Sequence, residues 1–509
     1  MADGPTLSDL DQLDPAALKM LVMGQKGEIA HLRLVVEKLQ RMLFGRSSEK
    51  SDRNSDQLPL LAEMPQPAGA ENRQPESQAK GNSTPPGARK PRSLPAHLRR
   101  EVRIHAPQNT ACPECGGQLK KLGEDVSEVL NYVPASFVVI RHVRPKMSCR
   151  TCSHVVQAAA PSRPVDRGLA GAGLLAHVVT SKFADHLPLY RQSQIYARQG
   201  VDLDRSTLAR WAAEASDLVQ PLVEVLRRYV MCSDKLHGDD TPLPVLAPGT
   251  GRTKIGRFWT YVRDSRPAGD TTPPAVWFTY SPDRKGEHPQ RHLASFRGIL
   301  QADAYSGFAR LYQDGSIQEA PCMAHIRRKF YDLMQAHHSP TAAQAVQRIA
   351  ALYQIEKEIR GRSPDQRREV RNARARPLLD SMRQWLEDSL AKLARKSDTA
   401  AAIHYALARW DALARYLDDG RIELDNSAAE RALRAVAVGR KNYLFAGSDS
   451  GGERAAVFYS LIGSAKLNGL DPEAYLSHVF NRIADHPITR IEELLPWNVV
   501  ADLQPAKAA

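Results

Sequence analysis

Apolar residues recur with a seven-residue period near the start of the chain. One position of the repeat holds Val22, Ile29, Val36 and Leu43. The other holds Leu18, Leu32 and Leu39, with the polar residue Gln25 between the first two. β-branched residues at one seam position with Leu at the other favour a parallel two-stranded coiled coil, although fewer than four heptads is short for independent stability. A single amphipathic helix packed on its own protein explains the pattern equally well. We expect residues 1–50 to form a coiled-coil oligomerisation helix, and the chain to be a homodimer or a higher homo-oligomer.

The apolar pattern then stops. Residues 51–94 are rich in Pro, Gln, Ser, Gly and Asn and contain few large apolar side chains. Such a composition cannot bury enough surface to fold, so it predicts a disordered linker.

Two Cys-x-x-Cys pairs follow, in the stretches CPECGGQL and CRTC. Their thiolates, from Cys112, Cys115, Cys149 and Cys152, suit a tetrahedral structural Zn²⁺, and the β-rich segment between the pairs can fold back to bring them together. Because 33 residues separate the pairs, more than in the shortest zinc ribbons, His154 is an alternative ligand. We predict a zinc-ribbon-like domain at residues 95–165.

Two helical patterns lie between Lys182 and Leu226, broken at RQGVDLDRSTLARW. Gly200 ends the first helix, and Asp204 or Ser206 can cap the second. This outline predicts a helix-turn-helix DNA-binding domain at residues 166–232, although a plain helical hairpin gives the same pattern. The residues expected to contact DNA are Arg205, Thr207 and Arg210.

From Lys235 the pattern changes to strands, in KLHGDDTPLPVLA, GRFWTYVRD and AVWFTYS, then a polar helical stretch and the strand GILQADAY. Three strands, a helix and a fourth strand give the order of an α/β ribonuclease H-like core, whose first strand lies beside the fourth. We assign this core to residues 233–338 and 421–450. Helical patterns predict an insertion at 339–420 and a C-terminal helical region at 451–509.

The net charge of the chain indicates what kind of partner it binds. The 509 residues include 70 Lys and Arg against 57 Asp and Glu, a net charge of +13. This excess favours a polyanion as partner, with nucleic acid as the leading candidate and a merely well-solvated basic surface as the alternative. No apolar run reaches the ~18 residues of a membrane span, and the acidic, polar start does not resemble a signal peptide. The few cysteines favour a reducing cytoplasm.

Three carboxylates fall at matching ends of the predicted core elements. Asp239 lies on the first strand, Asp303 ends the fourth, and Glu430 opens a helix expected to begin at Ser427. Such oxygen donors suit two Mg²⁺ or Mn²⁺ ions ~4 Å apart, which activate a water or a 3′-hydroxyl and stabilise the leaving oxygen of a phosphodiester. Each acid also has a structural alternative: a turn for Asp239, a helix cap for Asp303, and a capping box between Ser427 and Glu430.

The chain resembles transposases of the insertion-sequence-66 family, bacterial enzymes of the DDE class. The resemblance is carried by LFGRSSEK, the two cysteine pairs, SKFADHLPLYRQSQIYARQGVDLDRSTLARW, DDTPLPVL, LQADAYSGFARLY, CMAHIRRKFYDL and DNSAAERALRAVAVGRKNYLFAGSDSGGERAAVFYSLI. The family usually shows Asp-Glu-Thr or Asp-Asp-Thr and a second Asn after Asp-Asn, where this chain has Asp240 and Ser427. Neither position carries one of the three carboxylates.

The resemblance implies that Asp239, Asp303 and Glu430 are the catalytic, metal-binding acids. It implies cleavage at the ends of an insertion sequence and attack of the freed 3′-hydroxyl ends on target DNA. Neighbouring basic side chains would then contact phosphates rather than bases: Arg327, Arg328, Arg431, Arg434, Arg440 and Lys441, with His325 near the scissile strand.

The implied partners are element-end DNA, target DNA and small accessory proteins, and the implied location is the cytoplasm of a bacterium, at the nucleoid. Two other readings share the sequence features. One is a nuclease or junction resolvase that hydrolyses DNA without joining it, and the other is a catalytically inactive DNA-binding protein.

Overall fold

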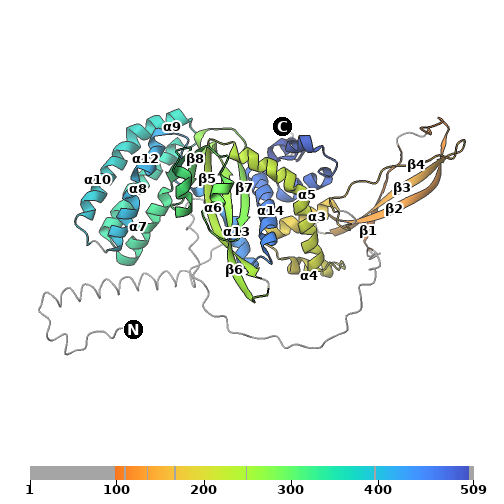
Figure 1. Ribbon diagram of the computed structural model, residues 1–509, viewed down its shortest axis with the longest axis horizontal. Coiled ribbons are helices and arrows are strands. Elements are labelled where there is room, and N and C mark those ends of the chain that lie inside the picture. The colour runs from red at the N-terminus through yellow and green to blue at the C-terminus, as the bar shows by residue number, and fades with distance from the viewer. Residues whose placement is uncertain are drawn as a thin grey trace, which may run out of the picture.

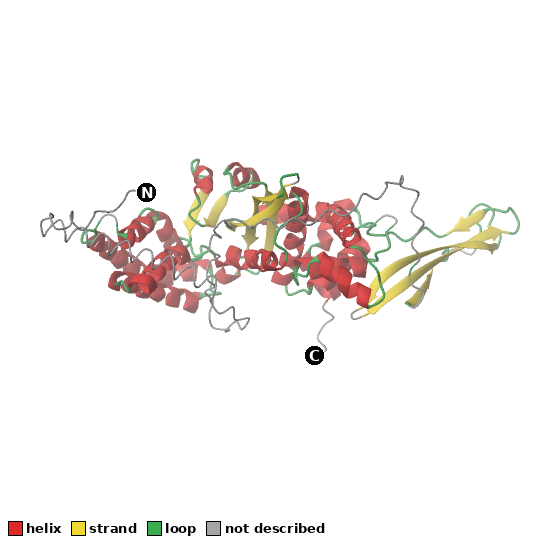
Figure 2. Ribbon diagram, turned by 90° about the horizontal axis from the view of Figure 1, so that it is seen from below, coloured by secondary structure: helices red, strands yellow, loops and turns green. Residues whose placement is uncertain are grey.

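The computed structural model describes residue 94 and residues 98–107, 111–133, 136–165, 168–247, 249–394 and 397–503. The predicted oligomerisation helix and nearly all of the predicted linker lie outside these residues. Along the longest axis of the molecule, a helical body, a central sheet with its covering helices and a long arm of strands follow one another (Figures 1 and 2).

The arm is a mixed sheet of four strands: β1 (Arg99–Ile104), β2 (Leu119–Val133), β3 (Ser136–Cys149) and β4 (Val155–Gln157). Strands β2 and β3 pair antiparallel from Leu119↔Cys149 to Val133↔Ser136. The hairpin end is fixed to the rest of the molecule, because Phe137 is buried in the main core and the Tyr132 ring stacks on His177 at 3.9 Å. At ~3.3 Å per strand residue, the cysteine end lies roughly 45 Å from that anchor.

The predicted helix pair is present as α4 (Leu189–Arg198) and α5 (Arg205–Met231), preceded by α3 (Ala172–Phe183). Gly200 follows α4 with φ +76°, a left-handed conformation that glycine adopts without strain. Helix α5 buries one face along its length, through residues spaced three or four apart: Leu208, Trp211, Ala215, Val219, Leu222 and Leu226. The opposite face is exposed along the helix, from Arg205 and Arg210 in its first turns to Arg228 near its end.

The central sheet contains β5 (Lys235–Ala247), β6 (Arg252–Arg263), β7 (Ala275–Ser281), β8 (Gly298–Ala302) and β9 (Ile317–Pro321) in the order β7-β6-β5-β8-β9. Strands β5, β6 and β7 run antiparallel, whereas β8 pairs parallel with both β5 and β9. The predicted neighbourhood of the first and fourth strands is therefore present. The short edge strand β9 lies in IQEAPCM, which the sequence pattern did not mark as a strand.

Two short helices frame β8 and β9. Helix α6 (Glu287–His292) precedes β8, and the 3₁₀ helix η2 (Ser306–Tyr312) links β8 to β9. A further 3₁₀ turn, η1 (Arg266–Ala268), lies in the β6–β7 connection.

After β9 the chain forms α7 (Met323–His337), α8 (Pro340–Ile359), α9 (Pro364–Val370), the π-helical segment η3 (Arg371–Ala375), α10 (Arg376–Leu390), α11 (Asp398–Leu407) and α12 (Trp410–Asp418). These helices share their own apolar core. Two arginines of the Arg-rich stretch are buried between them: Arg371 and Arg367 both pair with Glu356, at 2.7 and 3.2 Å.

The chain then returns to the sheet with α13 (Ser427–Asn442) and α14 (Asp449–Leu467), followed by α15 (Pro472–Arg482), η4 (Ile488–Leu494), η5 (Pro496–Asn498) and α16 (Val500–Leu503). Helix α13 starts at the predicted residue. Helix α14 includes Gly451 and Gly452 of GSDSGG, and a Cβ on Gly452 would lie 2.6 Å from the Tyr280 ring, so glycine permits this close packing on β7.

Helix α14 also protects the open edge of the sheet. The backbone N–H groups of Val276 and Phe278 on β7 donate to Ser464 Oγ and Ser460 Oγ at 3.1 and 2.8 Å. Serine hydroxyls thus replace the missing neighbouring strand and block edge-to-edge pairing. No helix in the described part of the chain is long and apolar enough to cross a membrane.

Candidate active site

Parallel pairing of β5 and β8 brings two of the predicted acids together. Their register aligns Lys235 with Ile299 and His237 with Gln301. Continued by two residues, it sets Asp239 level with Asp303, so that both side chains leave the same face of the sheet. Asp303 also accepts the backbone N–H of Tyr305 at 3.1 Å. This turn engages one carboxylate oxygen, but it is not the helix cap considered for Asp303, because the N-cap of η2 is Tyr305 and makes no side-chain capping bond.

The adjacent Asp240 has a different role. Its side chain is fully buried and accepts hydrogen bonds from Arg257 at 3.0 Å and Arg284 at 2.9 Å. Arg284 also lies 3.9 Å from Asp303 Oδ2. Because the Asp240 carboxylate is occupied by two guanidinium groups, Asp239 is the better metal ligand of the pair. Sequence reasoning missed Arg257 and Arg284, since nothing local marks an arginine as a partner of an acid on another strand.

The electrostatics of Asp239 fit a cation site. Burial raises the pKa of Asp239 well above its usual range, and the carboxylates of Asp303, Asp240 and Glu430 raise it further. Crowded carboxylates of this kind are relieved when a divalent cation binds between them. Carboxylate oxygens are the ligands that Mg²⁺ prefers, so Asp239, Asp303 and Glu430 are the residues that would hold it.

The capping box between Ser427 and Glu430, the structural alternative for Glu430, is not formed. The N-cap of α13 is Asn426, which makes no side-chain capping bond, and the Ser427 N–H donates to Asp425 Oδ1 at 3.0 Å. Asp425 therefore forms the turn that starts the helix, because it lies two residues before the donor. The Glu430 side chain is left for other contacts.

Glu430 lies beside Cys322, with Oε1 3.9 Å from Sγ. Burial and the neighbouring Asp425 raise the pKa of Glu430 to about 7, while Arg328 and Arg431 oppose this rise. Ligand atoms of Cys322, His325 and Glu430 all lie within 4.8 Å of one another. Within the described part of the chain, Asp239, Asp303 and Glu430 do not form so compact a group.

Asn426 joins the helix to the first strand. Its side chain is buried, donates to the Gly238 carbonyl at 2.9 Å and lies 3.0 Å from His237 Nδ1. Asn426 was not among the predicted site residues, although it directly follows Asp425 in the stretch DNSAAERALR.

The four predicted cysteines do meet. The Sγ atoms of Cys112 and Cys152 are 3.5 Å apart, those of Cys115 and Cys149 are 3.4 Å apart, and all four lie within 4.8 Å without a disulfide. Backbone N–H groups of Cys152 and Thr151 lower the pKa of the Cys149 thiol to about 6, which favours the thiolate that zinc binds. The alternative ligand His154 instead lies 3.3 Å from Glu114. The residues present therefore fit a four-cysteine structural zinc site.

Comparison with known families agrees with this geometry. The family described as "Transposase IS66 family" matches residues 167–454. The chain belongs to the IS66 transposase family. The zinc-finger binding domain of transposase IS66 matches residues 109–153, and the IS66 C-terminal element matches residues 460–497. A fourth match, "Transposase C of IS166 homeodomain", covers residues 31–103, where sequence analysis expected a coiled coil and a linker.

Relatives of this IS66-family chain span nearly its whole length. A protein of Sinorhizobium fredii named y4hP is 42% identical over 92% of this chain and 88% of its own length. A second S. fredii protein, y4jD, is 40% identical over 96% of this chain and 97% of its own. Both carry the description "uncharacterized", so they support membership of the family and no particular reaction.

The predicted phosphate-contacting residues of this IS66-family chain fall into two groups. Arg431, Arg434 and Lys441 are exposed, and the last two share the helical face of Glu430, four and eleven residues along α13. Arg440 instead turns to strand β5, where it donates to Thr241 Oγ1 at 2.9 Å and to the Pro242 carbonyl. This internal contact occupies part of its guanidinium group.

The remaining predicted contacts lie on other helices. Arg327 and Arg328 are half-buried on α7, and the charge of Arg328 acts on Glu430. On α5, Arg205 and Arg210 are exposed, Thr207 is half-buried, and Arg210 pairs with Glu214 at 3.0 Å.

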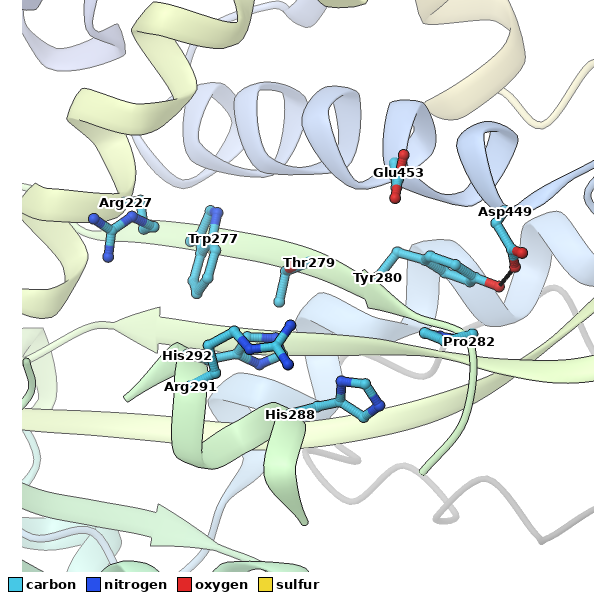
Figure 3. Close-up of a pocket in the computed structure, with 10 residues that line it drawn as sticks. All are labelled: Arg227, Trp277, Thr279, Tyr280, Pro282, His288, Arg291, His292, Asp449 and Glu453. Atoms are coloured by element: carbon cyan, nitrogen blue, oxygen red, sulfur yellow. Dashed lines mark hydrogen bonds between the residues drawn. The ribbon is translucent and has the colours of Figure 1, made fainter. Parts of the chain in front are cut away.

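A cavity of about 550 Å³ lies away from the three acids, between β7, α6 and α14. It is lined by Arg227, Trp277, Thr279, Tyr280, Pro282, His288, Arg291, His292, Asp449 and Glu453. In Figure 3, Asp449 and Glu453 of α14 lie across β7 from the basic side chains of α6, and Tyr280 donates to Asp449 at 2.5 Å. None of the candidate catalytic acids contributes to this cavity.

Proposed function

We propose that this protein is a DDE transposase that cleaves the ends of an insertion sequence and joins the 3′-hydroxyl ends to target DNA. The observation that carries the proposal is the alignment of Asp239 with Asp303 across the parallel strands β5 and β8, with α13 bringing Glu430 to the same end of the sheet. Two Mg²⁺ or Mn²⁺ ions, when bound by these acids, would activate the attacking oxygen and stabilise the leaving one.

The strand order supports a ribonuclease H-like core. Three antiparallel strands followed by two parallel ones, with the first beside the fourth, fit that fold; Asp239 lies on β5, and Asp303 directly follows the neighbouring strand β8. Helices α8 to α12 would then form an insertion between the strands and the helix of the third acid. Their apolar core also takes in Ile299 of β8 and Ala320 of β9, so the insertion would pack against that side of the sheet.

Basic residues of the chain would hold and orient the DNA. The exposed Arg431, Arg434 and Lys441 run from Glu430 along α13, where they would neutralise phosphates of the scissile strand. Arg205, Thr207 and Arg210 at the start of α5 would contact the element end as part of a helix-turn-helix. Affinity contributed by phosphate contacts falls steeply with salt concentration.

Strand transfer distinguishes the proposed reaction from its rivals. Full-length protein is incubated with Mg²⁺, a target plasmid and labelled DNA from the flanks of its own coding sequence. We expect nicks at the element ends and labelled ends joined to the target, with Asp239→Asn as the inactive control. Nicks without joined product would indicate the nuclease reading, and binding without nicks would indicate the inactive DNA-binding protein.

A further inference from the structure

A cysteine, a histidine and a glutamate meet where α7 begins beside α13. Cys322 directly precedes α7, His325 lies in its first turn, and Glu430 lies in the first turn of α13. Residues three apart on a helix face the same side, so Cys322 and His325 present their side chains together. One ligand atom from each of the three residues lies within 4.8 Å of the other two.

Cys322 places a sulfur atom beside His325 and Glu430. The side chain is buried, and Sγ accepts the backbone N–H of Asn426 at 3.2 Å. The cysteine cluster of the arm shows the same feature, since Cys149 Sγ accepts the backbone N–H of Thr151 at 3.4 Å.

His325 supplies the second observation. Its Nδ1 is buried and has no hydrogen-bond partner among the described residues. A buried polar nitrogen without a partner costs free energy, and such exceptions in native structures call for an explanation. A metal ion bound at Nδ1 would take the place of the missing hydrogen-bond partner.

We propose that Cys322, His325 and Glu430 bind one divalent transition-metal ion of the zinc class, at a site separate from the four-cysteine cluster and from Asp239 and Asp303. A thiolate with an imidazole selects zinc over Mg²⁺, which takes oxygen ligands. Three protein ligands leave a fourth position open, the arrangement of zinc sites that bind a water or a substrate oxygen.

The site would anchor the third acid. A carboxylate has two oxygens, so Glu430 can face the zinc with one and the aspartate pair with the other. The inference goes beyond the proposed function and does not rest on it, because metal binding at these residues requires no DNA chemistry.

Metal content of the full-length protein tests the proposal. Protein purified from zinc-containing medium without chelator should hold about two zinc ions per chain, one in each cluster. Cys322→Ser and His325→Asn should each lower the content by about one ion, whereas Cys232→Ser, at an exposed cysteine outside both clusters, should not change it. After cobalt exchange, the Cys322→Ser variant should lose part of the thiolate charge-transfer absorption.

Circular dichroism checks that each variant is folded. If Cys322→Ser fails to fold, the zinc content of His325→Asn tests the proposal instead. About one zinc per chain in the wild type, or a second zinc retained by His325→Asn, would overturn the proposal. Asp239→Asn separates the two proposals, since it should keep both zinc ions while losing cleavage. Loss of a zinc ion in Asp239→Asn would place that ion with the aspartates and refute a separate site.

Discussion

Asn426 donates a hydrogen bond of 2.9 Å from its side-chain amide to the carbonyl oxygen of Gly238. Gly238 directly precedes Asp239, and Asn426 directly precedes helix α13, which carries Glu430. The same side chain lies 3.0 Å from Nδ1 of His237, whose pKa burial lowers to about 3, so that the neutral ring donates to the amide oxygen. One buried amide therefore sets the position of the third acid relative to the first.

Asn426→Ala should impair both stability and cleavage. The change leaves Gly238 O and His237 Nδ1 buried without partners, which should lower the free energy of unfolding by about 2–3 kcal/mol. Displacement of α13 by even ~1 Å should slow cleavage by about 10²-fold. Chemical denaturation and single-turnover cleavage measure the two effects. Asn442→Ala, near the other end of α13, is the matched control and should change neither; equal losses in both variants would contradict a positioning role.

Glu430→Gln should abolish cleavage while leaving the fold intact. The glutamate makes no capping bond, so the amide removes a charge without removing a helix cap. We expect a loss of several orders of magnitude in cleavage, as for Asp239→Asn and Asp303→Asn, since each 1.36 kcal/mol of lost transition-state stabilisation is about tenfold. Melting temperature and DNA affinity should stay near wild type.

Two variants control for the chemistry of that substitution. Glu453→Gln makes the same change at an exposed position on α14 and should cleave normally. Ser427→Ala should alter stability by less than about 0.5 kcal/mol, because the Ser427 side chain does not cap α13. Glu430→Gln cleavage within tenfold of wild type would return the search for the third acid to Asp425 or Glu423.

Removal of zinc from the arm should unfold its cysteine end and spare the central sheet. The apolar cluster there consists of little more than Cys112, Leu119 and Cys149, so metal ligation supplies most of its stability. Hydrogen exchange of the chelator-treated protein, or of Cys149→Ser, should accelerate within Ala111–Val156, most of all near the cysteines. The hairpin end, anchored through Tyr132 and Phe137, should exchange as slowly as before. Uniform acceleration along β2 and β3 would argue against local unfolding.

Glu423 should make stability depend on pH in the acid range. Burial alone would raise the pKa of Glu423, but Lys235 and Arg367 lower it below the ordinary 4.5. A lowered pKa in the folded state means that the stabilisation is present above pH ~4.5 and is lost as pH falls through the folded value. Glu423→Gln should lower the free energy of unfolding by about 3 kcal/mol at pH 7, because two buried cations lose their charged partner. On acidification, the free energy of unfolding should fall less in this variant than in the wild type. Urea unfolding between pH 7 and pH 3 measures the free energy of unfolding of both proteins. If it falls in parallel in the two, Glu423 is not the source of the pH dependence.

The heptad pattern near the start of the chain predicts self-association. Ile29→Lys together with Leu32→Glu would place charges in the apolar seam and should shift the protein toward monomer, with weaker pairing of two DNA ends. Light scattering measures the mass, and Gln25→Lys is a milder control at the position that is already polar. An unchanged mass would favour the single packed helix over the coiled coil.

The sequence by itself determined the local features. The two cysteine pairs, the alternation of the core strands and the start of α13 follow from patterns within about a dozen residues, and the structure contains each of them. The sequence also predicted that the first core strand lies beside the fourth, because short connections leave few ways to arrange three strands, a helix and a fourth strand. The edge strand β9 escaped notice because its five residues include Gln318 and Glu319 and show no clear alternation.

Tertiary structure alone decided what the side chains of the candidate site contact. The sequence offered Ser427 as a local partner of Glu430, three residues away, but packing places Cys322 beside it, 108 residues earlier in the chain. Asn426 likewise donates a hydrogen bond to Gly238, 188 residues earlier, and Asp240 accepts hydrogen bonds from Arg257 and Arg284. A local capping bond contributes only about 1 kcal/mol, so buried contacts from distant segments readily override it. Which acid pairs with arginine and which neighbours a thiol are therefore set by how the sheet and its helices pack, and no pattern of neighbouring residues encodes that choice.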